Sequence, residues 1–171
     1  MKILGEKSLS SKVVLGLYGL FIIISFIDVI VLGTLMKVIR NIIIEKYILK
    51  NVSELTFFTM LINTGIIALY IIYQFIKIFI NLKNNILFSI DNVKRLNIVS
   101  NSCFIISSVY LMLATLMFFM LDTLIGEFIH YIFVFSITLM VIFVVSGIGI
   151  KILNEIYKKA IEYKEENDFT I

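Results

Sequence analysis

Four long runs of apolar residues alternate along this chain with shorter stretches that carry most of its charge. The runs cover residues 13–36, 55–76, 98–121 and 128–150, and each is longer than the roughly 20 predominantly apolar residues that a helix needs to cross a bilayer. A helix also satisfies its own backbone hydrogen bonds in lipid. We therefore predict an all-α membrane protein, a four-helix transmembrane bundle in which residues 1–171 form a single integral membrane domain.

Composition agrees with this prediction and excludes several classes of function. The chain is 60% hydrophobic and 16% charged, whereas a soluble domain is about 45–50% apolar and about 25% charged. Cys103 is the single cysteine and His130 the single histidine, so one chain has too few ligands for a zinc site. The sequence offers no nucleophile with a base and no glycine-rich phosphate loop. We expect a non-enzymatic protein with no metal, no cofactor and no direct nucleic-acid binding.

The lysines and arginines predict the orientation of the bundle. With both termini in the cytoplasm, eleven of the fifteen basic residues lie on the cytoplasmic side, and only four would do so in the opposite orientation. Because cytoplasmic loops carry an excess of Lys and Arg, we expect a multi-pass protein of the bacterial cytoplasmic membrane with cytoplasmic termini.

The orientation assigns the connections between the runs to opposite sides. Residues 37–54 would form an 18-residue outer connection, with Val38–Leu49 in the outer interface. Asn51 stands three residues before Glu54, the spacing of a capping box, so we expect Asn51 to begin the second helix. Residues 122–127 are too few for anything but a tight turn between antiparallel neighbours.

Polar residues within two of the runs recur at helical spacing. The third run and its flanks place polar residues every seven positions, and the second run uses three- and four-residue steps. Repeats of this kind keep one seam toward a neighbour in left-handed helix packing. We therefore expect left-handed antiparallel packing with the seams facing inward. The seam residues are Thr56, Thr59, Asn63, Tyr70, Tyr73 and Lys77 in the second run, and Lys94, Asn101, Ser108, Thr115 and Asp122 in the third.

Asp28 is the one acidic residue well inside a predicted crossing. A carboxylate there costs roughly 2.5–3.5 kcal/mol on insertion scales, so it needs a partner or water. Asn63, Thr115 and Ser136 fall at similar depth in the other runs, and we expect the four residues to form an intramembrane polar layer. Two interpretations stay open: a proton- or cation-binding site, or a hydrogen-bonded acid that holds helices together.

Two segments on the predicted cytoplasmic side carry the other candidate residues. In residues 88–100, Ser89 or Asp91 can cap a helix that starts before the membrane. Residues 151–166 place their apolar side chains on one arc of about 180°, as in an amphipathic helix. This C-terminal helix either continues the fourth crossing or packs against the bundle or a partner. We expect its end, residues 163–171, to fold back under the bundle, with its acids near Lys83, Lys94 or Arg95.

These two segments carry a family resemblance. The first motif resembles the "PFS–ENVKRL" signature of a bacterial family of four-crossing membrane proteins, domain of unknown function 2975 (YoaS-like), and the second resembles its "EENDLTI" ending. Leu87, Asp91 and Phe169 depart from the family pattern. The motif residues are Phe88, Ser89, Asp91, Asn92, Val93, Lys94, Arg95 and Leu96, and Glu165, Glu166, Asn167, Asp168, Phe169, Thr170 and Ile171. The resemblance also implies a regulatory pairing, because family members are often encoded beside a small helix-turn-helix DNA-binding protein.

The function that these features favour is a membrane regulator or sensor that engages a cytoplasmic partner, such as a small helix-turn-helix regulator, through residues 88–96 and the C-terminal tail. The alternative is a small transporter, channel or antimicrobial-peptide immunity protein that works through the Asp28 layer. The lipid bilayer is the expected surrounding, and a homo-oligomer stays open.

Overall fold

The computed structural model describes residues 9–45, 48–120 and 127–168 of the chain, which form four long helices. They are α1 (Leu9–Glu45), α2 (Ile48–Lys83), α3 (Ile90–Met120) and α4 (Glu127–Asp168). Each lies over one predicted apolar run, and all four are long and apolar enough to cross a membrane. The prediction of an all-α protein with four candidate membrane spans is therefore confirmed.

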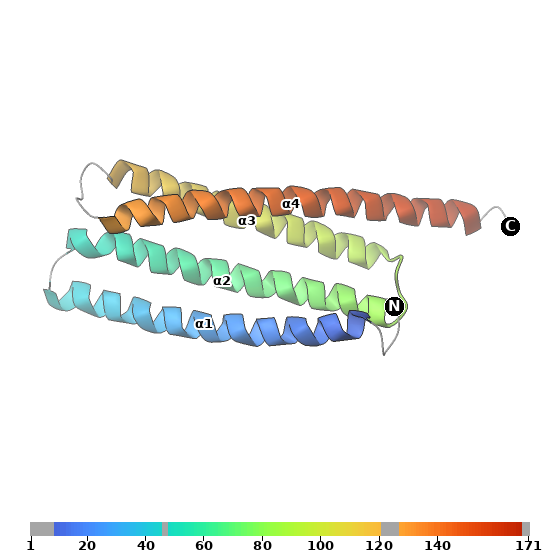
Figure 1. Cartoon of the computed structure of the whole chain (residues 1–171), viewed down its shortest axis with the longest axis horizontal. Helices are drawn as coiled ribbons and strands as arrows, with labels where there is room; N and C mark the ends of the chain where they lie inside the picture. Colours follow the sequence, from blue (N-terminus) through green and yellow to red (C-terminus); the bar gives the residue numbers. More distant parts are fainter. Residues whose placement is uncertain (1–8, 46–47, 121–126, 169–171) are drawn as a thin grey trace.

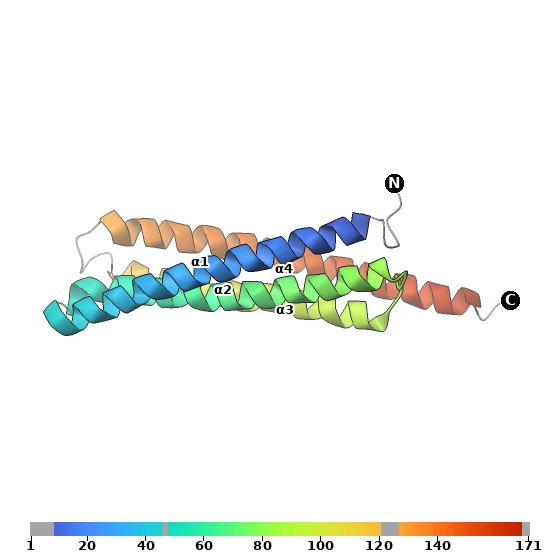
Figure 2. The same ribbon diagram turned by 90° about the horizontal axis from the view of Figure 1, so that it is seen from below.

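Neighbouring helices run antiparallel along the bundle (Figure 1). One end, which we call the basic end, carries the start of α1, the connection 84–89 between α2 and α3, and the end of α4. Helix α3 packs against both α2 and α4, whereas α1 packs chiefly against α2. Figure 1 shows α1 and α4 on opposite sides of the bundle, and Figure 2 shows that these two helices are inclined to each other.

The buried core lies between α3 and α4 and is closed by α2. Ile106, Tyr110, Leu113 and Met117 of α3 are almost fully buried against Ile132 of α4. The Tyr110 ring stacks on Phe143, and its hydroxyl lies next to the Thr64 side chain of α2. One buried aromatic side chain of α3 thus ties α2 and α4 to the same core.

The prediction of an 18-residue connection over residues 37–54 is wrong. Helix α1 continues to Glu45 and α2 begins at Ile48, so only residues 46–47 separate the two helices in sequence. Asn51 consequently lies within α2 and does not begin it. The physical reason is that residues 37–54 contain no glycine or proline. Neither helix therefore meets a helix-breaking residue where it extends beyond its apolar run.

Helix α4 contains both the predicted fourth crossing and most of the C-terminal segment. It is one continuous helix of 42 residues, which at 1.5 Å per residue extends for about 63 Å. Its last turns reach beyond the ends of the other three helices (Figure 1). The expected fold-back of the tail is wrong for residues 163–168, because these residues continue α4 and residues 162–167 are exposed. Phe169, Thr170 and Ile171 lie outside the described residues.

Candidate functional site

The connection at the basic end is a tight turn followed by a capped helix. Asn85 has a left-handed backbone with φ of 63°, and the Ile86 amide donates to the carbonyl of Asn81 at 2.8 Å. The Ser89 hydroxyl then accepts a hydrogen bond from the Asp91 amide at 3.2 Å. Ser89 is thus the residue that caps α3, as its position before Ile90 predicts.

Asn92 holds this connection against α2. Its side chain is fully buried, and its amide oxygen accepts a hydrogen bond from Asn81 at 2.7 Å. Its amide nitrogen lies 3.4 Å from the carbonyl oxygens of both Ile86 and Leu87. One side chain therefore links α2, the connection and the first turn of α3.

Arg95 makes a second link between α2 and α3, one turn further along. Its Nε donates to Asp91 Oδ2 at 2.9 Å, and its Nη1 donates to Gln74 Oε1 at 3.0 Å. Leu96 is buried beside it, whereas Lys94 is exposed. The sequence motif at residues 88–96 therefore contributes mainly to the architecture of the junction.

Helix α4 joins the same junction from the other side. The Tyr157 hydroxyl donates a hydrogen bond to the Leu87 carbonyl, and its ring lies 6.2 Å from that of Phe88. The Lys164 ammonium lies 5.6 Å from the centroid of the Phe88 ring. The 88–96 motif and the C-terminal part of α4, which are about 70 residues apart in the chain, thus form one site.

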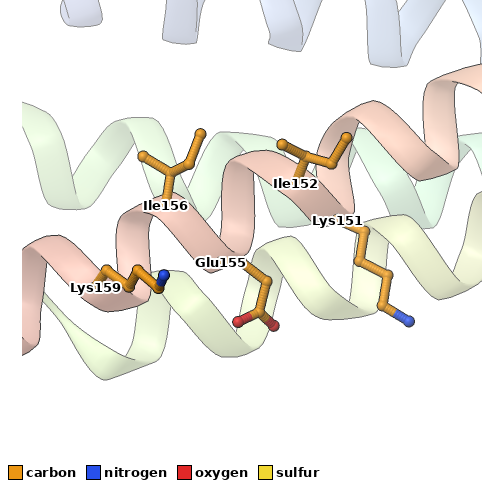
Figure 3. Close-up of a pocket in the computed structure, with 5 residues that line it drawn as sticks. All are labelled: Lys151, Ile152, Glu155, Ile156 and Lys159. Carbon is orange, nitrogen blue, oxygen red and sulfur yellow. The ribbon is translucent and has the colours of Figure 1, made fainter.

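Two concave surfaces flank this junction. The first is a groove of about 270 Å³ between the start of α3 and the end of α4; it combines apolar and charged side chains, namely Ile90, Val93, Lys158, Ile161, Glu162 and Glu165. The second lies on α4 alone (Figure 3) and is lined by Lys151, Ile152, Glu155, Ile156 and Lys159.

The side chains of this second surface are arranged by kind. Figure 3 shows Ile152 and Ile156 pointing to one side of α4, with Glu155 and Lys151 on the other. Ile152 is 57% exposed and Ile156 is 61% exposed. We call these five residues the α4 stripe.

Inside the bundle, Asp28 does not meet Asn63. It lies against Gly65 instead, where an added Cβ would be 1.9 Å from Asp28 Oδ1. Residues 63 and 65 are about 200° apart on a helix, so the contact at Gly65 turns Asn63 away from α1. Asp28 Oδ2 is buried without a hydrogen-bond partner in the described part of the chain.

The expected polar layer is not assembled by the structure. Ser136 is buried, but its hydroxyl donates to the Ile132 carbonyl of its own helix at 2.7 Å. Thr115 is exposed and donates to Leu111 at 2.9 Å. Asp28 is separated from both because α1 packs chiefly on α2.

The two polar seams also differ from their predicted direction. Thr59, Asn63, Tyr70 and Tyr73 of α2 are exposed, and so are Lys94, Asn101, Ser108 and Thr115 of α3. The inward orientation is therefore wrong for these residues. Helix α2 instead presents Gly65 to α1, and Gln74 and Asn81 to α3.

Several residues of the junction were not singled out by the sequence patterns. Gln74 and Asn81 of α2 bind Arg95 and Asn92, and Ser100 donates to the Gly147 carbonyl at 2.9 Å. The seven-residue spacing of Gln74 and Asn81, which puts both on one helix face, was the available signal. Of the C-terminal motif, Glu165, Glu166 and Asn167 are exposed on the last turns of α4.

The fold and the junction define the class of this protein: a helical bundle of membrane type, in which the 88–96 motif and the C-terminal part of α4 are in contact at one end. Residues 48–171 match the family described as Protein of unknown function (DUF2975), and the chain belongs to this family. The match covers α2, α3 and α4 with both motifs, which confirms the resemblance. No curated protein and no solved structure matches the chain.

Proposed function

We propose that the protein is a non-enzymatic regulator or sensor of the bacterial cytoplasmic membrane, and that its basic end engages a cytoplasmic protein. The bias of eleven in fifteen basic residues toward this end supports a cytoplasmic position for it and for both termini. The observation that carries the proposal is the α4 stripe. Its two isoleucines are exposed, and they lie on the helix that extends beyond the ends of the other three.

The chemistry of the α4 stripe suits a protein partner. Ile152 and Ile156 follow the predicted end of the fourth crossing at residue 150, where the hydrocarbon gives way to water. Burying apolar surface is favourable by about 25 cal/mol per Å². Lys151, Glu155 and Lys159 alternate in sign beside the isoleucines, a pattern that suits an amphipathic partner helix better than an anionic lipid surface.

The 88–96 motif has a supporting role in this proposal. Asn92, Arg95 and Leu96 are engaged within the chain. They fix the junction against which α4 is held by Tyr157. The exposed Lys94 and the half-exposed Phe88 remain at the rim of the site for a partner to reach.

The continuity of α4 supports a sensing role. A helix without proline, running unbroken from Glu127 to Asp168, transmits a shift of its membrane part to the α4 stripe. The hydrogen bond from Tyr157 to Leu87 and the Lys164–Phe88 contact are the restraints that such a shift would release. A hydrogen bond contributes about 0.5–1.5 kcal/mol net and an exposed cation–π contact about 0.5–1 kcal/mol, so a modest signal suffices to release them.

Site-specific photo-cross-linking in cells tests the proposal. A photoreactive residue at position 156 should give an adduct with a cytoplasmic protein, and the family resemblance makes a helix-turn-helix regulator the expected product. The matched control places the probe at Ile22, an exposed residue of α1 within its predicted crossing, where only lipid should be captured. The double variant Ile152→Asp, Ile156→Asp should remove the protein adduct at a second probe position, Lys159.

Two results would contradict the proposal. One is that probes at positions 156 and 22 cross-link to the same proteins. The other is a cytoplasmic adduct at Lys159 that survives the double variant while the protein stays in the membrane at its normal level.

A further inference from the structure

An exposed polar face within the predicted membrane region is unexplained by the cytoplasmic site. It consists of Thr59, Asn63, Tyr70 and Tyr73 of α2 and Asn101, Ser108 and Thr115 of α3, all of them exposed. We call it the α2–α3 polar face. Polar side chains at membrane depth ordinarily face a bundle interior, water or another helix, so this face requires a cover.

The two helices contribute to the same side of the bundle. On α2, Gly65 faces α1, whereas Gln74 and Thr64 face α3. Helical spacing from Gly65 places Asn63 and Tyr70 on the side of α2 away from α1. On α3, Arg95 faces α2, and Ser100 faces α4 through the Gly147 carbonyl. The polar residues of α3 fall outside both contacts, on the side away from α1 and α4.

The polar groups also lie at matching levels. Gln74 is opposite Arg95, and Thr64 is opposite Tyr110. In this antiparallel register Asn63 is level with Ser108, Thr59 with Thr115, and Tyr70 with Asn101. Asn63 and Ser108 fall near the middle of the predicted crossings 55–76 and 98–121, where an exposed amide is most costly.

The bonds made within the chain leave these groups with unused capacity. Asn63 uses one N–H for the Thr59 carbonyl at 2.9 Å, so its amide oxygen and second N–H still face outward. Ser108 and Thr115 donate to carbonyls four residues earlier, and their oxygens can still accept. In hydrocarbon, where water is excluded, the polar side chains of another helix meet this demand.

We propose that the α2–α3 polar face is the interface of a homodimer whose two-fold axis runs along the membrane normal. Copies of one chain insert with one orientation, as the charge bias of this sequence requires, so only an axis along the normal can relate two of them. Each residue then meets residues of its own level. Asn, Ser and Thr each carry a donor and an acceptor, which makes such a face complementary to itself.

The edges of the face are compatible with this arrangement. Lys77 lies 5.5 Å from the Tyr73 ring and Lys94 is exposed, both toward the basic end. Their long side chains can reach the headgroup region, where water and salt screen their repulsion across the axis. The α4 stripe lies on the helix on the other side of α3, so it stays accessible in the dimer.

Counting the copies in reconstituted nanodiscs tests the dimer directly. Single-molecule photobleaching of the purified full chain should give two steps. Asn63→Leu should weaken dimerisation on the order of three- to eighteen-fold for each interhelical hydrogen bond lost, and Asn63→Gln should restore most of it. The matched control is Ile22→Leu, a change of an exposed apolar residue of α1, which lies outside the α2–α3 polar face.

Disulfide trapping locates the interface. In a Cys103→Ser background, Asn63→Cys and Ser108→Cys should form dimers on oxidation, whereas Ile22→Cys on α1 should not. The proposal is overturned by a monomer at all lipid-to-protein ratios, by a dimer that Asn63→Leu leaves unchanged, or by preferential trapping through Ile22. A monomeric purified chain that is captured in native membranes by a different protein would likewise overturn it.

Discussion

The absence of a side chain at Gly65 decides where Asp28, a half-buried acid in the middle of α1, lies. Gly65 leaves the space that Asp28 occupies, and any larger residue would meet the carboxylate. The acid therefore acts at the α1–α2 contact, where α1 has its main packing partner. Asn63, two residues away, belongs to the opposite side of α2 and to a different role.

The substitution Gly65→Ala tests this contact. The added Cβ would lie 1.9 Å from Asp28 Oδ1, so the carboxyl group must leave its place, and we expect a loss of about 1–3 kcal/mol of stability. In an Asp28→Ala background the same change should cost much less, giving a coupling energy of about 0.5–3 kcal/mol. Thermal unfolding can be followed with a thiol-reactive dye, because Cys103 is buried.

Gly149→Ala is the matched control, since a Cβ at Gly149 meets nothing within 4 Å. It should leave stability unchanged or raise it by up to about 1 kcal/mol through helix propensity. Equal losses at both glycines would show that Asp28 has no special contact with Gly65.

At the scale of the elements, α4 is coupled to the turn between α2 and α3. The junction has no disulfide among the described residues and rests on hydrogen bonds from Asn92, Arg95 and Tyr157. Leu87 stands where the family pattern resembled in the sequence has proline, and its carbonyl is the acceptor for Tyr157. The departure affects the side chain and leaves this acceptor in place.

Tyr157→Phe should loosen this junction without unfolding the bundle. A typical net hydrogen bond contributes about 0.5–1.5 kcal/mol, so amide hydrogen exchange of residues 84–93 should quicken several-fold while that of the core of α3 stays unchanged. Tyr163→Phe is the matched control, because Tyr163 is 69% exposed. Protection of residues 84–93 that is identical in the two variants would exclude a restraining role for the Tyr157 hydroxyl.

At the scale of the whole molecule, the bias of the basic residues leads us to propose that the basic end of the bundle lies in the cytoplasm. This assignment places the junction and the α4 stripe where a soluble regulator can reach them. It also places His130, exposed near the start of α4, on the outer side.

Cysteine labelling in intact cells tests the orientation. In a Cys103→Ser background, Asn84→Cys and Glu155→Cys should resist a membrane-impermeant thiol reagent until the cells are opened, and His130→Cys should react at once. All three positions are exposed in the structure, so a difference between them reports the side of the membrane. Rapid labelling of position 84 or 155 from outside would reverse the assignment and remove the basis of the cytoplasmic site.

The sequence by itself determined the number and type of the elements and one end of the site. Four apolar runs became four helices, Ser89 capped α3, and the motifs at residues 88–96 and 165–171 identified the family. These features are local: they depend on the length of an apolar run, on a capping side chain or on a short string of residues. The capping-box spacing at Asn51 predicted a helix start that the structure does not have. Residues 37–54 contain no glycine or proline, so α2 begins earlier and includes Asn51.

Only the tertiary structure decided which side of each helix faces a neighbour. In water, apolar periodicity marks the buried face of a helix, but in a bilayer the core and the lipid are equally apolar. The polar seams of α2 and α3 could therefore be identified as stripes, but their outward direction depended on which helices pack together. The contact of Asp28 with Gly65, rather than with Asn63, likewise depends on how α1 packs against α2.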